Sequence, residues 1–463
     1  MIDIQRERTP ADLVPSIERL FTISAGKIRS IESSWSPANG APVFTAEGRY
    51  TARGWTEWTE GFQYGSALLQ FDATGEREFL ELGRQRTLTR MAPHLTHMGV
   101  HDHGFNNVST YGALWRMARE GKIEADDWEV RFYELALQVS GAVQAHRWTA
   151  IRDGGFIHSF NGAHSLFVDT IRSLRALALA YRLGHRLIEE QDAQVNLLSR
   201  VVQHARATAT YNVFRGTSGS PFDMRGRVAH ESLFNVANGT YRGPSTQQGY
   251  SPFTTWTRGL AWAMLGFAEQ LEFVSTLPGA ALGEVSAGDA AGWMLDAARA
   301  TSDFYIDVAA CADGIPYWDT GAPGLATLGD WASRPADPFN DREPVDSSAA
   351  AIGAQGLLRL GRFLNAHGQD GARYWQAGLR VVETLFNPAG PYLSQADSHQ
   401  GLLLHSVYHW PNGWDYVPSG AHVPRGESSQ WGDYHAREVA LYLLRIAKNQ
   451  PYLAFFGPSL THA

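Results

Sequence analysis

The sequence predicts an all-α protein whose helical hairpins close into a toroid, the (α/α)6 barrel. Apolar residues recur at steps of three and four along many segments, which is the spacing of one face of a helix. Glycine-containing loops follow several of these segments, as expected where helices stop, and alternating apolar and polar runs are rare. A chain of 463 residues has room for about a dozen helices of ordinary length, enough for such a toroid.

The periodic segments indicate where helices lie. In Phe167–Tyr181 apolar residues occupy nearly every face, which predicts a helix buried on all sides. Short strands are expected at Tyr241 and around Leu402–Tyr408. The other segments predicted to be helical are Gly61–Asp72, Val108–Arg119, Trp256–Phe273, Ser347–Leu364 and Asp433–Lys448.

The chain contains no clean linker, so we expect a single barrel domain over residues 1–463, with residues 1–50 as an N-terminal helix and extension. The stretches Thr320–Pro344 and Tyr408–Gly426 are rich in proline, glycine and aspartate and are predicted to be long loops over one face of the barrel. Long loops of this kind often carry functional residues.

Composition and charge argue against several classes of protein. The formal net charge of −8 argues against a nucleic-acid binder, and the longest apolar stretch, Leu260–Ala268, is far too short to span a bilayer. The single cysteine, Cys311, can form neither an internal disulfide nor a thiolate metal cage. The first residues contain no apolar segment typical of a signal peptide. We expect a cytoplasmic monomer or homodimer that uses no metal or cofactor and binds neither nucleic acid nor membrane.

The run His101-Asp102-His103 looks like a metal site. Adjacent residues do not face one another, however, and no HExxH pattern follows, so we expect no metal there. Asp102 can cap the N-terminus of a helix, or it can be a catalytic or substrate-binding carboxylate.

Asp169 is a carboxylate within an otherwise apolar segment. It can be a buried aspartate bonded to backbone or to an arginine such as Arg172 or Arg175. Alternatively, apolar surroundings raise the pKa of a carboxyl group until it holds a proton near neutral pH, as a general acid requires. Asp102 and Asp169 would then be two carboxylates in unequal environments.

Arg258 and Trp262 are four residues apart and share one face of a predicted helix, and Gln248 precedes them in a loop. An arginine beside an aromatic ring suits a sugar carboxylate held over the ring plane, but the same pair can brace a helix through a cation–π contact. Asp346 and Asp433 each precede a predicted helix, and helix capping is the leading interpretation of both.

Eight motifs then follow one another in a recognisable order. They are WTEGF (Trp58–Phe62), HDHGF (His101–Phe105), FVDT (Phe167–Thr170), His230, QGY (Gln248–Tyr250), WTRGLAW (Trp256–Trp262), DSSAAAIGAQGLL (Asp346–Leu358) and WGDY (Trp431–Tyr434). In this order they resemble the unsaturated glucuronyl hydrolases, glycoside hydrolase family 88. The resemblance extends from about Trp55 to Leu444.

The resemblance implies a substrate left by polysaccharide lyases, an oligosaccharide whose non-reducing sugar is a 4,5-unsaturated uronic acid. Enzymes of this family hydrate the C4=C5 double bond, and the hemiketal that forms opens and releases the aglycone. By position, Asp169 resembles the general acid/base that protonates C4 and activates the water added at C5, and Asp102 resembles the second essential carboxylate. Positions that resemble substrate-binding residues are His230, Gln248, Arg258, Trp262, Trp58, His101 and Phe160.

The chain departs from the family pattern at several positions. Leu260 replaces a glutamine, and Arg172 and Ser173 replace part of a methionine-rich run. Phe160 stands where a tryptophan near the +1 sugar is expected, and His103 is additional. Alternatives on the same fold are therefore an unsaturated rhamnogalacturonyl hydrolase or a saturated-uronide hydrolase. From other classes, an N-acylglucosamine 2-epimerase-like isomerase and a catalytically silent sugar-binding toroid are alternatives.

Overall fold

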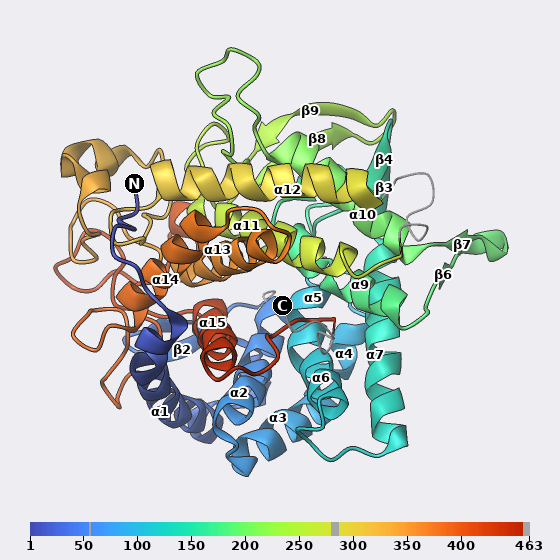
Figure 1. The fold of residues 1–463 in the computed structure, drawn as a ribbon, viewed down its shortest axis with the longest axis horizontal. Coiled ribbons are helices and arrows are strands. Elements are labelled where there is room, and N and C mark those ends of the chain that lie inside the picture. Colours follow the sequence, from blue (N-terminus) through green and yellow to red (C-terminus); the bar gives the residue numbers. More distant parts are fainter. Residues whose placement is uncertain (55–56, 279–286, 457–463) are drawn as a thin grey trace.

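The structure is a computed structural model that describes residues 1–54, 57–278 and 287–456 (Figure 1). Among these residues, six helical segments form an inner ring in which each segment contacts the next, and α15 contacts α2 to close the ring. In chain order the inner segments are α2 (Glu60–Thr74), α5 with α6 (His103–Asn107 and Ala113–Arg119), α8 with α9 (Thr170–Ser173 and Arg175–Arg182), α11 (Thr257–Val274), α13 (Ser347–Ala366) and α15 (Gln430–Ala447).

A second layer of helices surrounds this ring, and α1, α3, α7 and α12 are seen at its periphery in Figure 1. Helix α3 packs on α2, α7 and α10 on α9, α12 on α11, α14 on α13, and α1 on α15. Outer and inner helices thus alternate along the chain, and the expected (α/α)6 barrel is confirmed. The outer helices are α1 (Pro10–Ser34), α3 (Arg77–Arg90), α7 (Asp127–His146), α10 (Leu197–Ala207), α12 (Ala287–Phe304) and α14 (Ala372–Phe386), and α4 (Ala92–Leu95) is a short connection.

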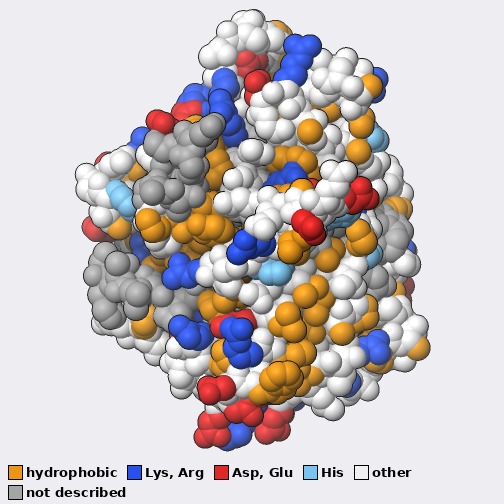
Figure 2. All heavy atoms as spheres, turned by 90° about the vertical axis from the view of Figure 1, so that its right-hand side faces the viewer, with side chains coloured by type: hydrophobic (Ala, Val, Ile, Leu, Met, Phe, Trp, Pro, Cys, Tyr) orange, Lys and Arg blue, Asp and Glu red, His pale blue; other side chains and the backbone are white. Residues whose placement is uncertain are grey.

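Burial differs between the two layers as their sequence patterns predict. Every residue of α11 is buried, because this helix lies between the ring interior and the outer layer. The outer helix α7 buries one face and exposes the other, where Trp128 is 76% exposed. Figure 2 shows apolar side chains scattered among charged ones over the side of the molecule that contains α7. Within the described part of the chain, no helix is long and apolar enough to cross a membrane.

Short antiparallel strands lie in the connections between the helices. The three-stranded sheet β5–β8–β9 pairs Phe167 with Glu231 and so brings the segment before α8 next to His230. Two-stranded sheets join β1 to β2, β3 to β4 and β6 to β7. The strands are β1 (Pro42–Ala46), β2 (Arg49–Ala52), β3 (Trp148–Ile151), β4 (Gly154–Ile157), β5 (Ser165–Phe167), β6 (Leu187–Ile188), β7 (Gln194–Val195), β8 (Glu231–Asn235) and β9 (Thr240–Ser245).

Most of the predicted helices are confirmed. The segments Gly61–Asp72, Trp256–Phe273 and Ser347–Leu364 match α2, α11 and α13 to within a few residues, and the strand expected at Tyr241 is β9. Asp346 caps α13, since its side chain accepts the backbone N–H groups of Ser348 and Ala349. The segment Val108–Arg119 is helical, but it begins as the π-helical turn η3 (Val108–Gly112) before α6.

Three expectations are wrong. Phe167–Tyr181 is not one helix, because Phe167 belongs to β5 and the backbone N–H of Val168 still donates to the His230 carbonyl. Asp433 does not cap α15, which begins at Gln430 with Ser429 as its cap. The segment Leu402–Tyr408 is no strand. The N–H groups of its first two residues donate to the Asp433 carboxylate and not to a neighbouring strand.

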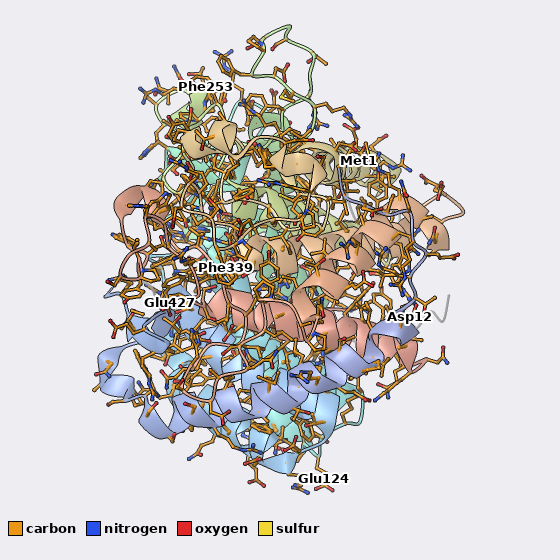
Figure 3. The ribbon with its side chains drawn as sticks, turned by 90° about the vertical axis from the view of Figure 1, so that its left-hand side faces the viewer. Met1, Asp12, Glu124, Phe253, Phe339 and Glu427 are labelled. Atoms are coloured by element: carbon orange, nitrogen blue, oxygen red, sulfur yellow. The ribbon has the colours of Figure 1, made fainter. Side chains whose placement is uncertain are left out.

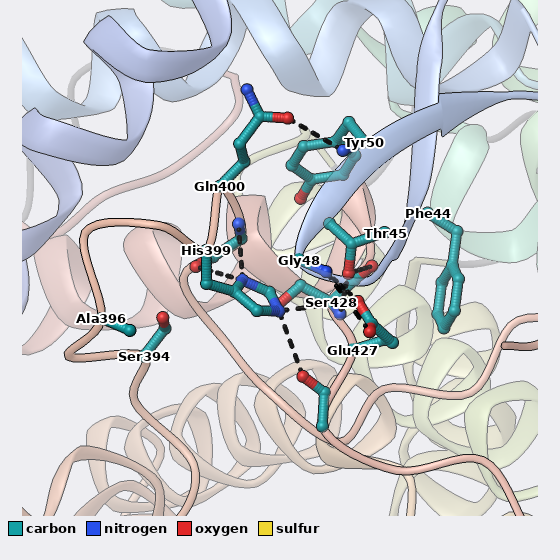
Figure 4. Close-up of polar contacts among 12 residues, drawn as sticks. Phe44, Thr45, Gly48, Tyr50, Ser394, Ala396, His399, Gln400, Glu427 and Ser428 are labelled. Carbon is teal, nitrogen blue, oxygen red and sulfur yellow. Dashed lines mark hydrogen bonds and ion pairs between the residues drawn. The ribbon is translucent and has the colours of Figure 1, made fainter. Parts of the chain in front are cut away.

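The N-terminal segment is joined to the C-terminal part of the chain. Figure 3 shows α1, with Asp12 near its start, beside the C-terminal helices, and α1 contacts both α14 and α15. The β1–β2 hairpin is held by the loops before α15 (Figure 4). The N–H of Tyr50 donates to the side-chain carbonyl of Gln400 at 2.9 Å, and that of Gly48 donates to Glu427. Trp55, where the family resemblance begins, lies outside the described residues.

Candidate active site

A cavity of about 530 Å³ opens where the inner helices begin. Asp102, Asp169 and Trp256 are the residues that precede α5, α8 and α11, so three inner helices point their N-terminal ends at it. The loop that contains Tyr408 also lines it. The lining residues are Trp58, Val100, His101, Asp102, Phe105, Phe160, Phe167, Asp169, Thr246, Gln247, Gln248, Trp256, Arg258, Trp262, Tyr408, His409, Asn412 and Trp414.

Close packing of α5 against α8 brings the two predicted carboxylates together. A Cβ atom on Gly104 would lie 2.1 Å from the carbonyl oxygen of Ser173, so only glycine allows this approach. The hydroxyl of Ser173 donates to the His101 carbonyl at 2.6 Å and accepts the Gly104 N–H at 3.0 Å. Ser173, one of the departures from the family pattern, therefore fixes the HDHGF segment.

His101 lies between Asp102 and Asp169. Its Nε2 is 3.3 Å from Asp169 Oδ1 and 3.7 Å from Asp102 Oδ1, while its Nδ1 has no hydrogen-bond partner. All three residues are buried, with 1% to 9% of their surface exposed. We call these three residues the acid cluster. Asp102 forms no side-chain cap at α5, which removes its capping interpretation.

The three members of the acid cluster differ in the direction of their pKa shifts. Burial raises the pKa of Asp102 to about 6, with the charge of Asp169 adding to the effect and His101 opposing it. Burial alone would lower the pKa of His101, but Asp102 and Asp169 stabilise the imidazolium and the net direction is upward. Burial also acts to raise the pKa of Asp169, but the charge and hydrogen bond of His101 outweigh it. The expectation that apolar surroundings raise the pKa of Asp169 is therefore wrong for the free protein.

His230 lies directly behind the cavity wall, with its ring 4.5 Å from that of Phe167 and 4.6 Å from that of Trp256. Its Nδ1 accepts the backbone N–H groups of Gln247 and Gln248, so the hydrogen of the neutral ring is on Nε2. This Nε2 is buried without a partner in the protein. Burial lowers the pKa of His230 to about 4, and at neutral pH the ring is an uncharged donor.

Arg258 is committed to partners inside the protein. One terminal nitrogen donates to Asp346 at 3.0 Å and to the Val407 carbonyl, and the other donates to Gln248 and to the Tyr408 carbonyl, both at 2.7 Å. Because Arg258 holds the carbonyl oxygen of Gln248, the amide NH₂ of Gln248 is available to a ligand in the cavity. Arg258 thus orients Gln248 and the Tyr408 loop, and its own terminal hydrogens are all in use.

Aromatic rings form the rest of the walls. Trp58 stacks on Trp431 at 5.0 Å, and Trp262 packs against Phe105 at 4.8 Å. Phe160 is 36% exposed and lies parallel to the His101 ring at 6.2 Å. The structure therefore brings together the predicted residues Asp102, Asp169, His101, Gln248, Arg258, Trp58, Trp262 and Phe160 as lining residues, with His230 immediately behind them.

The Tyr408–Gly426 loop contributes lining residues that the sequence did not predict individually. Tyr408, His409, Asn412 and Trp414 line the cavity, and Asp415 holds the loop by accepting the N–H groups of Tyr408 and His409. Two tryptophans, a histidine and an asparagine within a proline- and glycine-containing loop were the available signal. None of the lining residues belongs to Thr320–Pro344.

His103 does not join the site. Its Nδ1 contacts the hydroxyl of Ser140 at 3.1 Å and its Nε2 contacts the His97 carbonyl at 3.0 Å, both away from the cavity lining. Across residues 1–54, 57–278 and 287–456, no group of three or more histidine, cysteine, aspartate or glutamate side chains is arranged to hold a metal ion.

Comparison with known proteins agrees with the motifs. No family model matches the chain. The unsaturated glucuronyl hydrolase of Bacillus sp. strain GL1 is 25% identical over 414 residues, which cover 87% of this chain and 90% of the relative. The chain is thus similar to an unsaturated glucuronyl hydrolase over most of its length. The unsaturated chondroitin disaccharide hydrolase of Streptococcus pyogenes serotype M1 is 22% identical over 88% of this chain and 86% of its own length.

Solved unsaturated glucuronyl hydrolases share the fold. The crystal structure of the Bacillus sp. GL1 enzyme superimposes with a TM-score of 0.71 at 21% identity and covers 96% of this chain and 100% of its own. An unsaturated glucuronyl hydrolase specific for heparin superimposes with a TM-score of 0.71 at 19% identity, covering 94% and 98%. Two further solved structures are of protein variants with a bound sugar. One contains dGlcA-Glc-Rha-Glc, and the other, the enzyme of Streptococcus agalactiae, contains dGlcA-GalNAc6S.

Proposed function

We propose that this protein is a glycoside hydrolase that removes a 4,5-unsaturated uronic acid from the non-reducing end of lyase-generated oligosaccharides by hydrating the C4=C5 double bond. The observation that carries the proposal is the acid cluster at the wall of a cavity that also presents two neutral donors, the Gln248 amide and, just behind the wall, His230 Nε2. The relatives are named for hydrolysis of this class of substrate, which favours it over a sugar isomerase.

Proton transfer begins in the acid cluster. In the free protein the raised pKa of His101 and the lowered pKa of Asp169 favour the extra proton on His101, which lies between the two carboxylates. A bound uronate brings a negative charge and excludes water, and both changes raise the pKa of a neighbouring carboxylate. The proton then moves from His101 Nε2 to Asp169 Oδ1, a separation of 3.3 Å. Asp169 thereby becomes the acid that the chemistry needs, although its pKa is low before substrate binds.

The carbon chemistry follows with Asp169 acting twice. Its carboxylic acid donates the proton to C4, and the positive charge that develops at C5 is shared with the ring oxygen. Water adds to C5 and returns a proton to the Asp169 carboxylate, which restores the starting protonation state. The hemiketal at C5 opens and the aglycone leaves. Asp102 holds the proton on His101 between turnovers.

The neutral donors fix the substrate for this reaction. We assign the uronate carboxylate and ring hydroxyls to His230 Nε2 and the Gln248 amide, with Arg258 as a positioning residue that orients Gln248. Trp58 and Trp262 supply flat walls, and Phe160 covers the acid cluster near the aglycone. The proposal also includes a monomeric or homodimeric protein without metal or cofactor, in the cytoplasm. The free, buried thiol of Cys311 supports the cytoplasmic location.

The test is the near-ultraviolet absorbance of the conjugated enol-ether carboxylate, followed in a panel of unsaturated disaccharides from chondroitin, hyaluronan, gellan, ulvan and pectin. Hydration removes the chromophore, so we expect absorbance to fall with at least one member. No loss with any member contradicts the proposal and leaves a saturated-uronide hydrolase, tested with saturated analogues. A best substrate with rhamnose as aglycone would move the assignment to the rhamnogalacturonyl group.

A further inference from the structure

Arg147, the residue that follows the last turn of α7, is a buried cation bonded only to neutral groups. Its surface is 7% exposed. Each of its three guanidinium nitrogens donates to a backbone carbonyl: Nε to His158 at 3.2 Å, Nη2 to Ser159 at 2.7 Å, and Nη1 to Met98. It forms no ion pair with any aspartate or glutamate in the described part of the chain. Because a buried charge without a counter-ion is costly, we expect this charge to act on groups beyond hydrogen-bond distance.

The hydrogen bonds of Arg147 join the two segments that border His101. Met98 lies three residues before His101, and the other two carbonyls lead directly into Phe160, whose ring lies parallel to the His101 ring at 6.2 Å. In the last turn of α7, Gln144 also donates to the His101 carbonyl at 2.6 Å. The end of α7 therefore holds both the backbone of His101 and the turn that covers its ring. A planar guanidinium with donors on three nitrogens suits this bridging position.

The charge of Arg147 is complementary to that of the acid cluster. With the proton on His101, between the carboxylates of Asp102 and Asp169, the cluster carries one net negative charge. Arg147 is the one arginine among the main influences on the pKa of both His101 and Asp102, and it acts to lower both. A guanidinium keeps its proton throughout the pH range in which the protein is folded. Arg147 and the acid cluster together are therefore electrically neutral, although no ion pair joins them.

The other titratable groups around Arg147 and His101 supply no competing charge. Burial lowers the pKa of five nearby imidazoles, which are uncharged at neutral pH: His97, His103, His158, His204 and His230. Three further basic residues each lie beside a carboxylate of their own: His94 beside Glu60, His146 beside Glu189 and Arg175 beside Glu438. Arg147 is thus the fixed positive charge, among the described residues around the acid cluster, that has no other anion to balance.

We propose that Arg147 is a positioning residue of the active site, which holds the His101 segment against the Phe160 turn and supplies the positive charge that balances the acid cluster. A bound uronate adds a second negative charge beside Asp102 and Asp169, and the charge of Arg147 reduces the resulting repulsion. This last step rests on the proposed function. The effect of Arg147 on the proton held by His101 does not depend on any substrate.

The first experiment titrates His101 by NMR in protein with isotope-labelled histidine, its signal being the one that His101→Gln removes. Arg147→Gln keeps an N–H donor but loses the charge, whereas Arg147→Lys keeps both. Removing a nearby positive charge stabilises the imidazolium, so we expect the pKa of His101 to rise by about 0.5 unit or more in Arg147→Gln and to change by less than about 0.2 unit in Arg147→Lys. An unchanged pKa in Arg147→Gln, or equal shifts in both variants, would overturn the inference.

The second experiment measures turnover of an unsaturated disaccharide by the same variants. For Arg147→Gln we expect KM to rise about fivefold or more and the alkaline limb of kcat/KM to move to higher pH, and Arg147→Lys should restore both. An unchanged KM and alkaline limb in Arg147→Gln would contradict the role in the active site. The expected NMR shift without turnover of any disaccharide by the wild type would defeat the proposed function and leave the charge balance standing.

A matched control separates charge from general loss of stability. Arg437 is equally buried and donates to the hydroxyls of Ser24 and Ser66, neither of which lines the cavity. Arg437→Gln should lower the thermal midpoint and leave the pKa of His101 and KM as in the wild type. A shift in Arg437→Gln equal to that in Arg147→Gln would overturn the inference. If Arg147→Gln does not fold, Arg147→Lys decides: a rise of about 0.5 unit or more in the pKa of His101 contradicts the charge role, and an unchanged pKa supports it.

Discussion

Two buried ionic clusters lie on either side of the Trp262–His435 pair, and they are built in opposite ways. Trp262 lines the cavity, His435 lies edge-on to it at 4.9 Å, and His435 Nε2 is 3.9 Å from Glu438. On the cavity side is the acid cluster. On the far side is a second group, which we call the inner cluster: Arg172, Arg175, Glu269, Glu272, Arg359 and Glu438.

The inner cluster balances three arginines with three glutamates, and the acid cluster does not balance. Arg172 pairs with Glu269 and Glu438, both at 2.9 Å, and none of the six side chains is more than 6% exposed. Burial acts to raise the pKa of Glu438, but Arg172, His435 and Arg359 together outweigh it and the net direction is downward. Asp102, in contrast, has a raised pKa. Glu438 therefore contributes to stability as a carboxylate and Asp102 does not, although burial also raises the pKa of two other members of the inner cluster, Glu269 and Glu272, to about 7.

The largest effect is expected for Asp169→Asn. If Asp169 transfers the proton to C4, kcat/KM falls at least 10³-fold, within the range of about 10² to 10⁴ typical of general acid–base catalysis. The variant keeps the shape of the side chain, so its circular dichroism spectrum should match that of the wild type, while loss of the His101 pair lowers its thermal midpoint. A folded Asp169→Asn protein with more than a tenth of wild-type turnover would rule out this role.

For Glu438→Gln we expect a loss of folding stability that is comparable in free energy to the loss of catalysis in Asp169→Asn. The substitution leaves Arg172 and Arg175 without a full complement of anions in a dry interior, and we expect the free energy of unfolding to fall by about 3–5 kcal/mol. Chemical denaturation measures this value. The matched control is Glu18→Gln, which removes the exposed pair with Lys448 and should change stability by about 0.5 kcal/mol or less. Equal effects of the two substitutions would contradict a structural role of the inner cluster.

Asp102→Asn should change stability in the opposite direction. The pKa of Asp102 in the folded protein is about 6, above its ordinary value of 3.8. A raised carboxyl pKa means that its contribution to stability is present below pH 3.8 and is lost as the pH rises through about 6. At pH 8 the variant should therefore be more stable than the wild type by roughly 1–3 kcal/mol, and at pH 3.5 the two should be equal. A less stable variant at pH 8 would show that the acid cluster is structural.

The smallest expected effect is a shift in the pH profile. Activity requires the proton on His101, so kcat/KM should decline as the pH rises through the pKa of His101, which lies above its usual value. Asp102 is the largest of the influences that raise this pKa. The residual activity of Asp102→Asn should thus decline at lower pH than that of the wild type. An unchanged alkaline limb would remove His101 from the proton pathway.

The sequence predicted the barrel and the lining residues that the inner helices bring to the cavity, but neither the individual residues of the Tyr408–Gly426 loop nor the electrostatics of the site. Helix α11 was predictable because its apolar pattern reflects burial of every face. The hydrogen bonds that Arg258 donates within the protein were not predictable, because its partners Asp346 and Tyr408 follow it by 88 and 150 residues. The low pKa of Asp169 likewise depends on His101, which lies 68 residues away. Local patterns record the burial of a residue, whereas the charges around it are set by distant segments.

The closure of the inner ring has a consequence for biosynthesis. Helix α15, residues Gln430–Ala447, contacts α2 and α1, although about 350 residues separate it from α2 and about 400 separate it from α1. The ribosome must therefore synthesise most of the chain before α1 and α2 can contact α15. Until then the faces of α1 and α2 that pack against α15 lack their native partner, although α2 can already contact α1 and α3. Nascent chains of this protein should depend on chaperones in proportion to the time needed to synthesise α15.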